Sequence, residues 1–288
     1  MALHVVTDST NYLPAADLAR LGIDVVPLFV TDGDSVSAET DLDFTAFYRR
    51  LEDTRVLPTS SQPSLDSLVA AFRRGAEAGD EVLGVFLSSK MSGTYESALL
   101  AATMVRDEVP GSRIEVLDSE SNCMQEGFAV LSAAEAGSTG ASIEECIAAA
   151  RATIARSRFV FTPRSLEYLR RGGRIGNASA LLGTLLQILP VLTVEGGLTT
   201  TDAKVRTHAK ALERIRDDFE RDVAEKGLRR VVVHSIAEFS GAAAFAAEVI
   251  EPIAGCHVDV IPVGPVIGTH VGSAVGLVYE TEQPLRVL

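Results

Sequence analysis

The feature of this chain that most restricts its fold is an alternation, through its first half, of short β-branched or apolar runs with stretches of helical periodicity. The short runs predict strands at residues 3–7, 23–30, 81–86 and 113–117. The longer stretches predict helices at residues 14–21, 44–53, 65–78, 94–108, 123–136 and 143–157. Strands that alternate with helices are typical of βα units around a mostly parallel sheet. The first half is therefore predicted to form such a sheet.

A less regular pattern begins near Phe159 and predicts a second unit. Its expected strands are residues 191–195, 198–200, 229–234, 257–262 and 274–280. Two glycines, Gly196 and Gly197, predict a hairpin between the first two, and the spacing of apolar residues in 207–225 predicts an amphipathic helix. A length of 288 residues suits about two domains. We predict an N-terminal α/β domain at 1–158, a mixed-sheet α/β domain at 159–288, and a ligand in the cleft between them.

Charge and cysteine content exclude several classes of function. The chain has 26 Lys and Arg against 39 Asp and Glu, a net charge of −13, which argues against nonspecific binding to nucleic acid or anionic membrane. Its five histidines are dispersed without metal-ligand spacing, so no metal site is predicted. The three cysteines suit neither a disulfide framework nor a CxxC site, and they predict buried thiols in a reducing cytoplasm.

The N-terminal residues show no secretory signal. The apolar run at 178–194 is interrupted by polar residues and is shorter than a membrane span. A cytoplasmic protein without a membrane anchor is expected.

Two segments rich in hydroxyl residues are candidates for ligand contact. The candidates in residues 57–64 are Thr59, Ser60 and Ser61. The candidates in residues 87–95 are Ser89, Ser92, Gly93 and Thr94. The second segment follows a predicted strand and opens a predicted helix, where unpaired backbone N–H groups favour an anion. The alternative for both segments is helix capping, with Ser61 or Gln62 before Pro63 in the first.

Two further segments place cationic side chains among glycines. In residues 170–176 a helix C-cap, with Gly172 at positive φ, explains Arg170 and Arg171. It does not explain Arg174, whose guanidinium is suited to fork onto an anion in a cleft. In residues 264–276 glycines allow close approach of the backbone to a ligand and flank Thr269 and His270. A structural role for His270 is the alternative.

The sequence lacks several common nucleotide-binding and catalytic motifs. It contains no GxxxxGK[ST] phosphate loop, no GxSxG nucleophile elbow and no HExxH motif. The chain is therefore not expected to bind ATP by itself.

Five ordered motifs together resemble the DegV family. They are VTDST at 6–10, PTSSQPS at 58–64, SSKMSGTY at 88–95, LEYLRRGGRI at 166–175 and the segment at 264–272. The resemblance spans the chain and implies a two-domain DegV-like α/β fold, related to part of dihydroxyacetone kinase, that binds fatty acid. It further implies that hydroxyls of Thr59 or Ser60 and of Ser92 hold the carboxylate. The family's cationic positions would fall on Arg174, Arg206 and His270, and would serve phosphoryl transfer or kinase docking.

Some members of that family are the lipid-carrying subunit of a fatty acid kinase and present the acyl carboxylate to a separate ATP-binding subunit. The resemblance therefore implies a carrier, not catalytic on its own, for one long-chain fatty acid of the palmitate, stearate or oleate type. It implies no covalent cofactor, and a transient encounter with a membrane is compatible with it.

The apolar run supplies candidates for a lipid tunnel, because a helix that is apolar around its girth must be covered by protein or ligand. The predicted wall residues are Leu181, Leu182, Leu185, Leu186, Ile188 and Leu189. The alternative is a plain buried core helix. Two other functions remain open: a small-molecule enzyme of the dihydroxyacetone-kinase-like fold that uses His270 as general base or nucleophile, and a ligand-sensing regulatory module.

Overall fold

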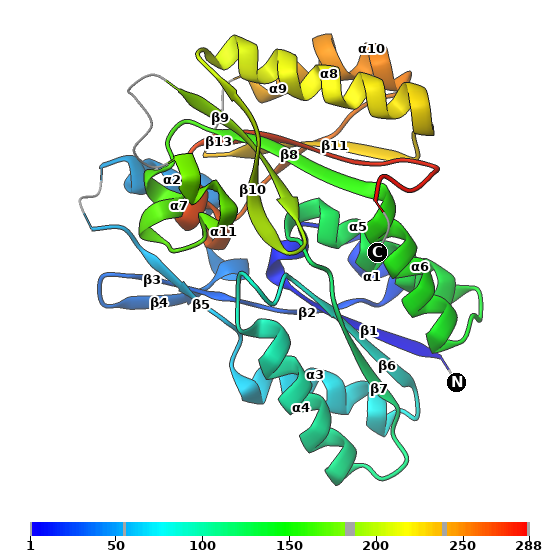
Figure 1. The fold of residues 1–288 in the computed structure, drawn as a ribbon. Coiled ribbons are helices and arrows are strands. Elements are labelled where there is room, and N and C mark those ends of the chain that lie inside the picture. Colours follow the sequence, from blue (N-terminus) through cyan, green and yellow to red (C-terminus); the bar gives the residue numbers. More distant parts are fainter. Residues whose placement is uncertain (1, 54–55, 182–187, 238–240, 287–288) are drawn as a thin grey trace.

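The computed structural model describes residues 2–53, 56–181, 188–237 and 241–286, and it is built from three sheets with helices packed between and around them (Figure 1). The first sheet is fully parallel, in the order β2-β1-β6-β7. Its strands are β1 (Leu3–Asp8), β2 (Asp24–Val26), β6 (Glu81–Phe86) and β7 (Ile114–Asp118). The parallel sheet predicted for the first half is thus confirmed.

Helices cover both faces of this sheet, because its strands are apolar on both sides. Val6 and Val82 pack with α3 (Leu65–Glu77) and α4 (Thr94–Glu108) on one face. Val5 and Leu83 pack on the other face with α5 (Cys123–Ser138) and α6 (Ile143–Arg156). The short helix α1 (Ala15–Leu21) also contacts α5.

The second half forms a mixed sheet of six strands in the order β10-β9-β8-β13-β11-β12. Its strands are β8 (Ser157–Pro163), β9 (Leu189–Glu195), β10 (Leu198–Val205), β11 (Arg230–Ile236), β12 (Val260–Pro262) and β13 (Ala274–Glu280). All neighbours are antiparallel except β11 and β12. The predicted hairpin is present, with Gly196 and Gly197 at φ of 52° and 81°.

The layer of α5 and α6 lies between the two large sheets, as Figure 1 shows. The outer face of the mixed sheet is covered by the predicted amphipathic helix, α8 (His208–Lys226), whose Ile215 and Phe219 are fully buried. It is joined there by α9 (Ala242–Ala244), a π-helical segment (Phe245–Ile250) and α10 (Glu251–Ala254). The mixed-sheet α/β unit predicted for the second half is therefore also confirmed.

A small third sheet was not predicted. It contains β3 (Phe29–Asp32), β4 (Ser35–Ala38) and β5 (Thr59–Ser61) in the order β4-β3-β5. The strand predicted at 23–30 is in fact two strands, β2 and β3, which belong to different sheets. Pro27 stands between them, and a proline has no N–H group for a strand ladder. The segment around Ser60, predicted as a helix-start loop, is β5.

One helix stands where a loop was predicted, and another has a different cap from the one predicted. Residues 264–276 form α11 (Pro265–Val271) and then enter β13, and α11 packs against α2 (Phe44–Asp53) and α7 (Glu167–Arg171). Gly268 permits this approach, because a Cβ there would lie 2.1 Å from the Tyr48 hydroxyl. The helix α3 starts at Leu65 and is capped by Ser64, so the predicted cap by Ser61 or Gln62 is wrong.

The motif at residues 6–10 serves to join strand ends. Asp8 closes β1, and its carboxyl accepts hydrogen bonds from Thr10 N at 2.8 Å and from Leu87 N, just after β6, at 2.9 Å. Glu126 of α5 accepts from the hydroxyls of Thr7 and Thr10. Burial raises the pKa of Asp8 and of Glu126.

The cysteine prediction needs one correction. Cys123 and Cys146 are buried free thiols, but Cys256, which follows α10, is exposed. Among the described residues, no helix is both long and apolar enough to cross a membrane.

Candidate functional site

A cavity of about 230 Å³ lies at the carboxyl end of the parallel sheet, where both halves of the chain meet. The first half contributes β5, the segment after β6 and Asn122 before α5. The second half contributes β8, the turn after α7, the β9–β10 hairpin, β11 and α11. A crevice outside the carboxyl ends of parallel strands is where open α/β sheets bind ligands.

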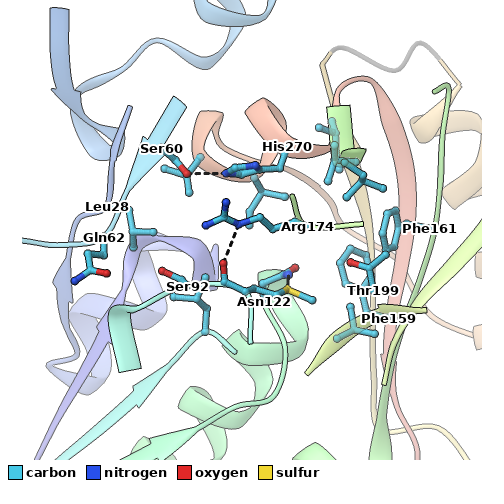
Figure 2. Close-up of a pocket in the computed structure, with 18 of the residues that line it drawn as sticks. Leu28, Ser60, Gln62, Ser92, Asn122, Phe159, Phe161, Arg174, Thr199 and His270 are labelled. Carbon is cyan, nitrogen blue, oxygen red and sulfur yellow. Dashed lines mark hydrogen bonds between the residues drawn. The ribbon is translucent and has the colours of Figure 1, made fainter. Parts of the chain in front are cut away.

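The aromatic side chains Phe159 and Phe161 lie at the end of this cavity away from Ser60 and His270, whereas Leu28 lies on the same side as the polar residues (Figure 2). Ser60, Ser92, Arg174 and His270 lie on one side of the view. The apolar wall is formed by Leu28, Leu87, Phe159, Phe161, Leu169, Val194, Ile236, Val266, Ile267 and Val271. Such a cavity suits a ligand with a polar head and an apolar body.

Ser60 and His270 form the central contact of the polar end. Ser60 Oγ lies 2.7 Å from His270 Nε2, which joins β5 to α11. Burial, with a smaller contribution from the charge of Arg174, lowers the pKa of His270 to about 4. The imidazole is therefore neutral at pH 7 and contributes a hydrogen bond rather than a charge.

A glycine sets the position of the imidazole. A Cβ at residue 172 would lie 2.2 Å from His270 Nδ1, so a larger residue there would displace the ring. The positive φ predicted for Gly172 is wrong: its φ is −72°, and Gly173 takes the left-handed conformation at 71°. The need for glycine at 172 comes from a side chain about 100 positions away, and no local sequence pattern reveals it.

Arg174 carries a charge that no carboxylate in the described part of the chain neutralises by an ion pair. Its Nε donates to Met91 O at 3.0 Å and its Nη1 donates to Gly172 O at 2.7 Å. Arg170 and Arg171 instead pair with Glu167, and their hydrogen bonds lower the pKa of that carboxyl to about 2. The exposed Arg174 guanidinium is thus available to an anion at the cavity.

The segment after β6 is held against the β9–β10 hairpin. Ser88 Oγ donates to Gly197 O at 2.7 Å, and Lys90 Nζ donates to Gly196 O at 2.7 Å. Ser92 faces the cavity, and its Oγ lies 2.9 Å from Thr94 Oγ1. These contacts fix a hydroxyl of the first half against a strand pair of the second half.

The structure places some of the predicted ligand-contact residues around this cavity. The predicted residues that line the cavity are Ser60, Ser61, Ser92, Gly93, Arg174 and His270. The predicted residues that do not line it are Thr59, Ser89, Thr94, Arg206 and Thr269. Arg206 directly follows β10 and is exposed.

Of the predicted tunnel wall, three residues are described and none lines this cavity. Leu181 is buried, Ile188 is 39% exposed and Leu189 begins β9. Leu182, Leu185 and Leu186 lie outside the described residues. Sequence reasoning missed the aromatic end, Phe159 and Phe161, because a buried strand that is apolar on both faces does not show which face meets a ligand.

Comparison with known proteins gives whole-length matches. A family model, that of uncharacterised proteins of the DegV family, matches residues 2–282. A DegV domain-containing protein of Clostridium acetobutylicum is 40% identical over 292 residues, which cover 99% of this chain and 100% of the relative.

Solved structures also match this chain over almost its whole length. DegV of Bacillus subtilis, a fatty acid binding protein, has a TM-score of 0.85 and 33% identity, with 98% of this chain and 99% of that chain covered. A stearic acid-binding protein from Eubacterium ventriosum has a TM-score of 0.89 and 26% identity, with 97% and 98% covered.

Proposed function

The chain belongs to the DegV family, as its motifs predicted, and we propose that its cavity binds one long-chain fatty acid. The observation that carries the proposal is the division of the cavity into a polar end around Ser60, His270 and Arg174 and an apolar end around Phe159 and Phe161. Palmitate, stearate and oleate have the required chemistry. The fatty acid bound by the Bacillus subtilis relative and the stearic acid bound by the Eubacterium ventriosum protein support it.

The carboxylate lies at the polar end in this proposal. Hydroxyls of Ser60 and Ser92 donate hydrogen bonds to it, and the guanidinium of Arg174 supplies the opposing charge. His270 orients the Ser60 hydroxyl through their 2.7 Å contact and, being neutral, does not need a buried counterion.

The acyl tail enters the apolar end. Burial of each methylene stabilises the complex by about 0.8 kcal/mol, so about 14 methylenes give a gross gain of about 11 kcal/mol. Association costs about 4 to 15 kcal/mol. A bound chain must therefore be enclosed almost completely. The candidates that we propose for the rest of the tunnel wall are those named from the sequence: Leu181, Leu182, Leu185, Leu186, Ile188 and Leu189.

We further infer that a separate ATP-binding kinase phosphorylates the carboxylate while this chain holds it. The sequence has no phosphate loop, and Arg174 at the cavity together with exposed Arg206 offers positive charge for a phosphoryl group or for docking. We propose that the protein acts in the cytoplasm, which suits its three free thiols. We also propose that the boundary between its two domains lies near residue 158.

An enzyme that uses His270 and Ser60 as a catalytic pair is less well supported. In a serine–histidine nucleophile system a third group orients the imidazole through its other nitrogen. Here His270 Nδ1 is buried against Gly172 and forms no hydrogen bond with a described residue. The pair is better suited to holding a ligand than to activating a nucleophile.

The test is to denature the purified protein, extract it with organic solvent and analyse the extract by mass spectrometry. We expect about one fatty acid per chain. Removal of the lipid should lower the melting temperature, and added palmitate or oleate should restore it, because a ligand that binds only the folded state stabilises by mass action. An extract without fatty acid, together with an unchanged melting temperature after addition, would refute the proposal.

The kinase step needs its own measurement. A partner kinase with ATP should form acyl phosphate from fatty acid only when this chain is present. Arg206→Ala should keep its lipid and lower acyl-phosphate formation about 10-fold or more, because Arg206 does not line the cavity. Equal rates with and without the chain would refute the carrier role.

A further inference from the structure

Thr199 is a polar residue in the part of the cavity that is otherwise apolar. It lies on β10 and is 4% exposed. Figure 2 shows it beside Phe159 and Phe161, on the side of the cavity away from Ser60 and His270. No described residue forms a hydrogen bond with its hydroxyl, which is not enclosed by protein atoms and borders the space of the cavity.

Other buried threonines of the same sheet are satisfied by the protein. Thr162 Oγ1 donates to Pro190 O at 2.9 Å, and Thr193 Oγ1 donates to Phe159 O at 2.8 Å. Buried hydroxyls are normally paired in this way, because an unpaired polar group away from water is costly. Of these three threonines, Thr199 alone lines the cavity, and a ligand that fills the cavity would take its hydroxyl out of contact with water.

The position of Thr199 is fixed by its surroundings. Its backbone pairs with Val194 on β9, so both side chains point to the cavity face of the hairpin. A Cβ at residue 176 would lie 2.7 Å from Thr199 O, so Gly176 lets the segment after α7 pack directly on this strand. The hydroxyl is therefore held in place rather than carried on a mobile loop.

A second polar group lies between the two ends of the cavity. Asn122 is 7% exposed, lines the cavity and appears between Ser92 and Thr199 in Figure 2. Its Nδ2 donates to the sulfur of Met91 at 3.1 Å, and its Oδ1 has no hydrogen-bond partner among the described residues. The wall along the ligand is thus more polar than a saturated hydrocarbon chain requires.

Resting on the proposed function, we propose that the preferred ligand is a hydroxylated fatty acid, whose hydroxyl group lies in the distal part of the acyl chain and hydrogen-bonds to Thr199 Oγ1. A saturated chain would remove water from this hydroxyl and give it no partner. A chain hydroxyl restores the lost bond, since it both donates and accepts. Sites built to hydrogen-bond a ligand hydroxyl discriminate strongly against analogues that lack it.

The experiment compares the affinities of stearic acid, 10-hydroxystearic acid and 12-hydroxystearic acid for the delipidated protein by titration calorimetry. We expect at least one hydroxylated chain to bind about 10-fold more tightly than stearic acid, equivalent to about 1.4 kcal/mol. In Thr199→Val, which keeps the shape and removes the hydroxyl, the ratio of the two affinities should fall to about one. Thr199→Ser, which retains the hydroxyl, should keep a preference.

A matched control lies next along the strand. Thr200 points to the opposite face of β10 and its hydroxyl donates to Leu198 O, so Thr200→Val should keep the wild-type ratio. Stearic acid binding without any preference for the hydroxylated chains would overturn this inference and leave the proposed function standing. A preference that persists in Thr199→Val would also overturn it. Failure of all three acids to bind would overturn both.

Discussion

Single residues determine the geometry around the polar end of the cavity. Two neighbouring glycines there are required for different physical reasons. Gly172 has an ordinary backbone conformation but lies against the His270 ring, whereas Gly173 has a φ of 71° and open space around its Cα. The same amino acid is required by packing at one position and by backbone conformation at the next.

Substitution of each glycine by alanine should separate these causes. Gly172→Ala forces the imidazole away from Ser60, so fatty acid affinity should fall about 10-fold or more through loss of a hydrogen bond that orients the carboxylate donor. Gly173→Ala should lower the free energy of unfolding by about 1 kcal/mol through its left-handed backbone and leave the affinity unchanged. Calorimetric titration and denaturant unfolding of both variants measure this. Equal affinities in the two variants would contradict the packing argument.

The hydroxyls can be tested in the same way. Ser92→Ala removes a donor that lines the cavity, and a hydrogen bond to a charged group contributes about 1.5 to 3 kcal/mol. Thr59→Ala, two strand positions before Ser61, removes an exposed hydroxyl that does not line it. Binding assays with palmitate should show a loss of about 10-fold or more for Ser92→Ala and none for Thr59→Ala. A loss confined to Thr59→Ala would place the carboxylate elsewhere.

At the scale of elements, helix α11 carries His270, Ile267 and Val271 into the cavity, and α2 holds α11 in place. The Tyr48 hydroxyl lies 2.8 Å from Val263 O and 2.9 Å from Gly264 O, which are the carbonyls just before the helix. Tyr48 is 4% exposed and packs directly on Gly268. The small helix is thus positioned by a residue of the other half of the chain.

Substitution of Tyr48 should shift α11 and so alter the cavity, although Tyr48 does not line the cavity. Tyr48→Phe leaves Val263 O without its donor, whereas Gly264 O keeps its hydrogen bond from Gly268 N. The loss should lower the free energy of unfolding by about 1 to 3 kcal/mol and weaken fatty acid binding. Tyr95→Phe on α4, which is partly exposed, is the control and should change neither quantity. Thermal unfolding and palmitate titration provide the readouts. A fall in stability with unchanged affinity would show that α11 keeps its place without Tyr48.

Elements with a strong local pattern were predictable, and elements set by tertiary contacts were not. The spacing of Ile215 and Phe219 predicts α8, and the Gly196–Gly197 pair predicts the hairpin between β9 and β10. In contrast, β5 is a three-residue strand that exists because β3 lies beside it. The segment 264–271 is rich in glycine, yet it is helical because Glu39 and Tyr48 hold its start. The hydroxyl and cationic motifs indicated the polar end of the cavity, but its aromatic end comes from sheet packing.

At the scale of the whole molecule, a buried carboxyl joins the two halves. Glu39 is 1% exposed and lies just before α2. It accepts hydrogen bonds from Ser9 Oγ at 2.5 Å, from Tyr12 Oη at 3.1 Å and from Val266 N of α11 at 2.9 Å. Burial raises the pKa of Glu39 from 4.5 to about 7. The contact between the halves is therefore sensitive to pH near neutrality.

The sign of that sensitivity follows from linkage. A pKa that is higher in the folded state means that Glu39 contributes stability fully below pH 4.5 and that this contribution is lost as the pH rises through 7. His234 and His270 act in the opposite sense, because burial lowers the pKa of each to about 4; their contribution is present above pH 6.5 and is lost as the pH falls through 4. The pH dependence of the wild-type free energy of unfolding is a sum of these effects. The contribution of Glu39 is therefore measured as the difference between a Glu39 variant and wild type.

Glu39→Gln provides that difference, because glutamine resembles the protonated carboxyl at every pH. The free energy of unfolding of Glu39→Gln, measured relative to wild type in urea, should rise between pH 4.5 and pH 8 by an amount on the order of 3 kcal/mol. Glu96→Gln, at an exposed position on α4, is the matched control for the loss of one negative charge from a chain of net charge −13. A difference between Glu39→Gln and wild type that stays constant across this range would show that Glu39 is ionised throughout, and that the two halves are joined by a buried carboxylate rather than by a carboxyl that holds its proton.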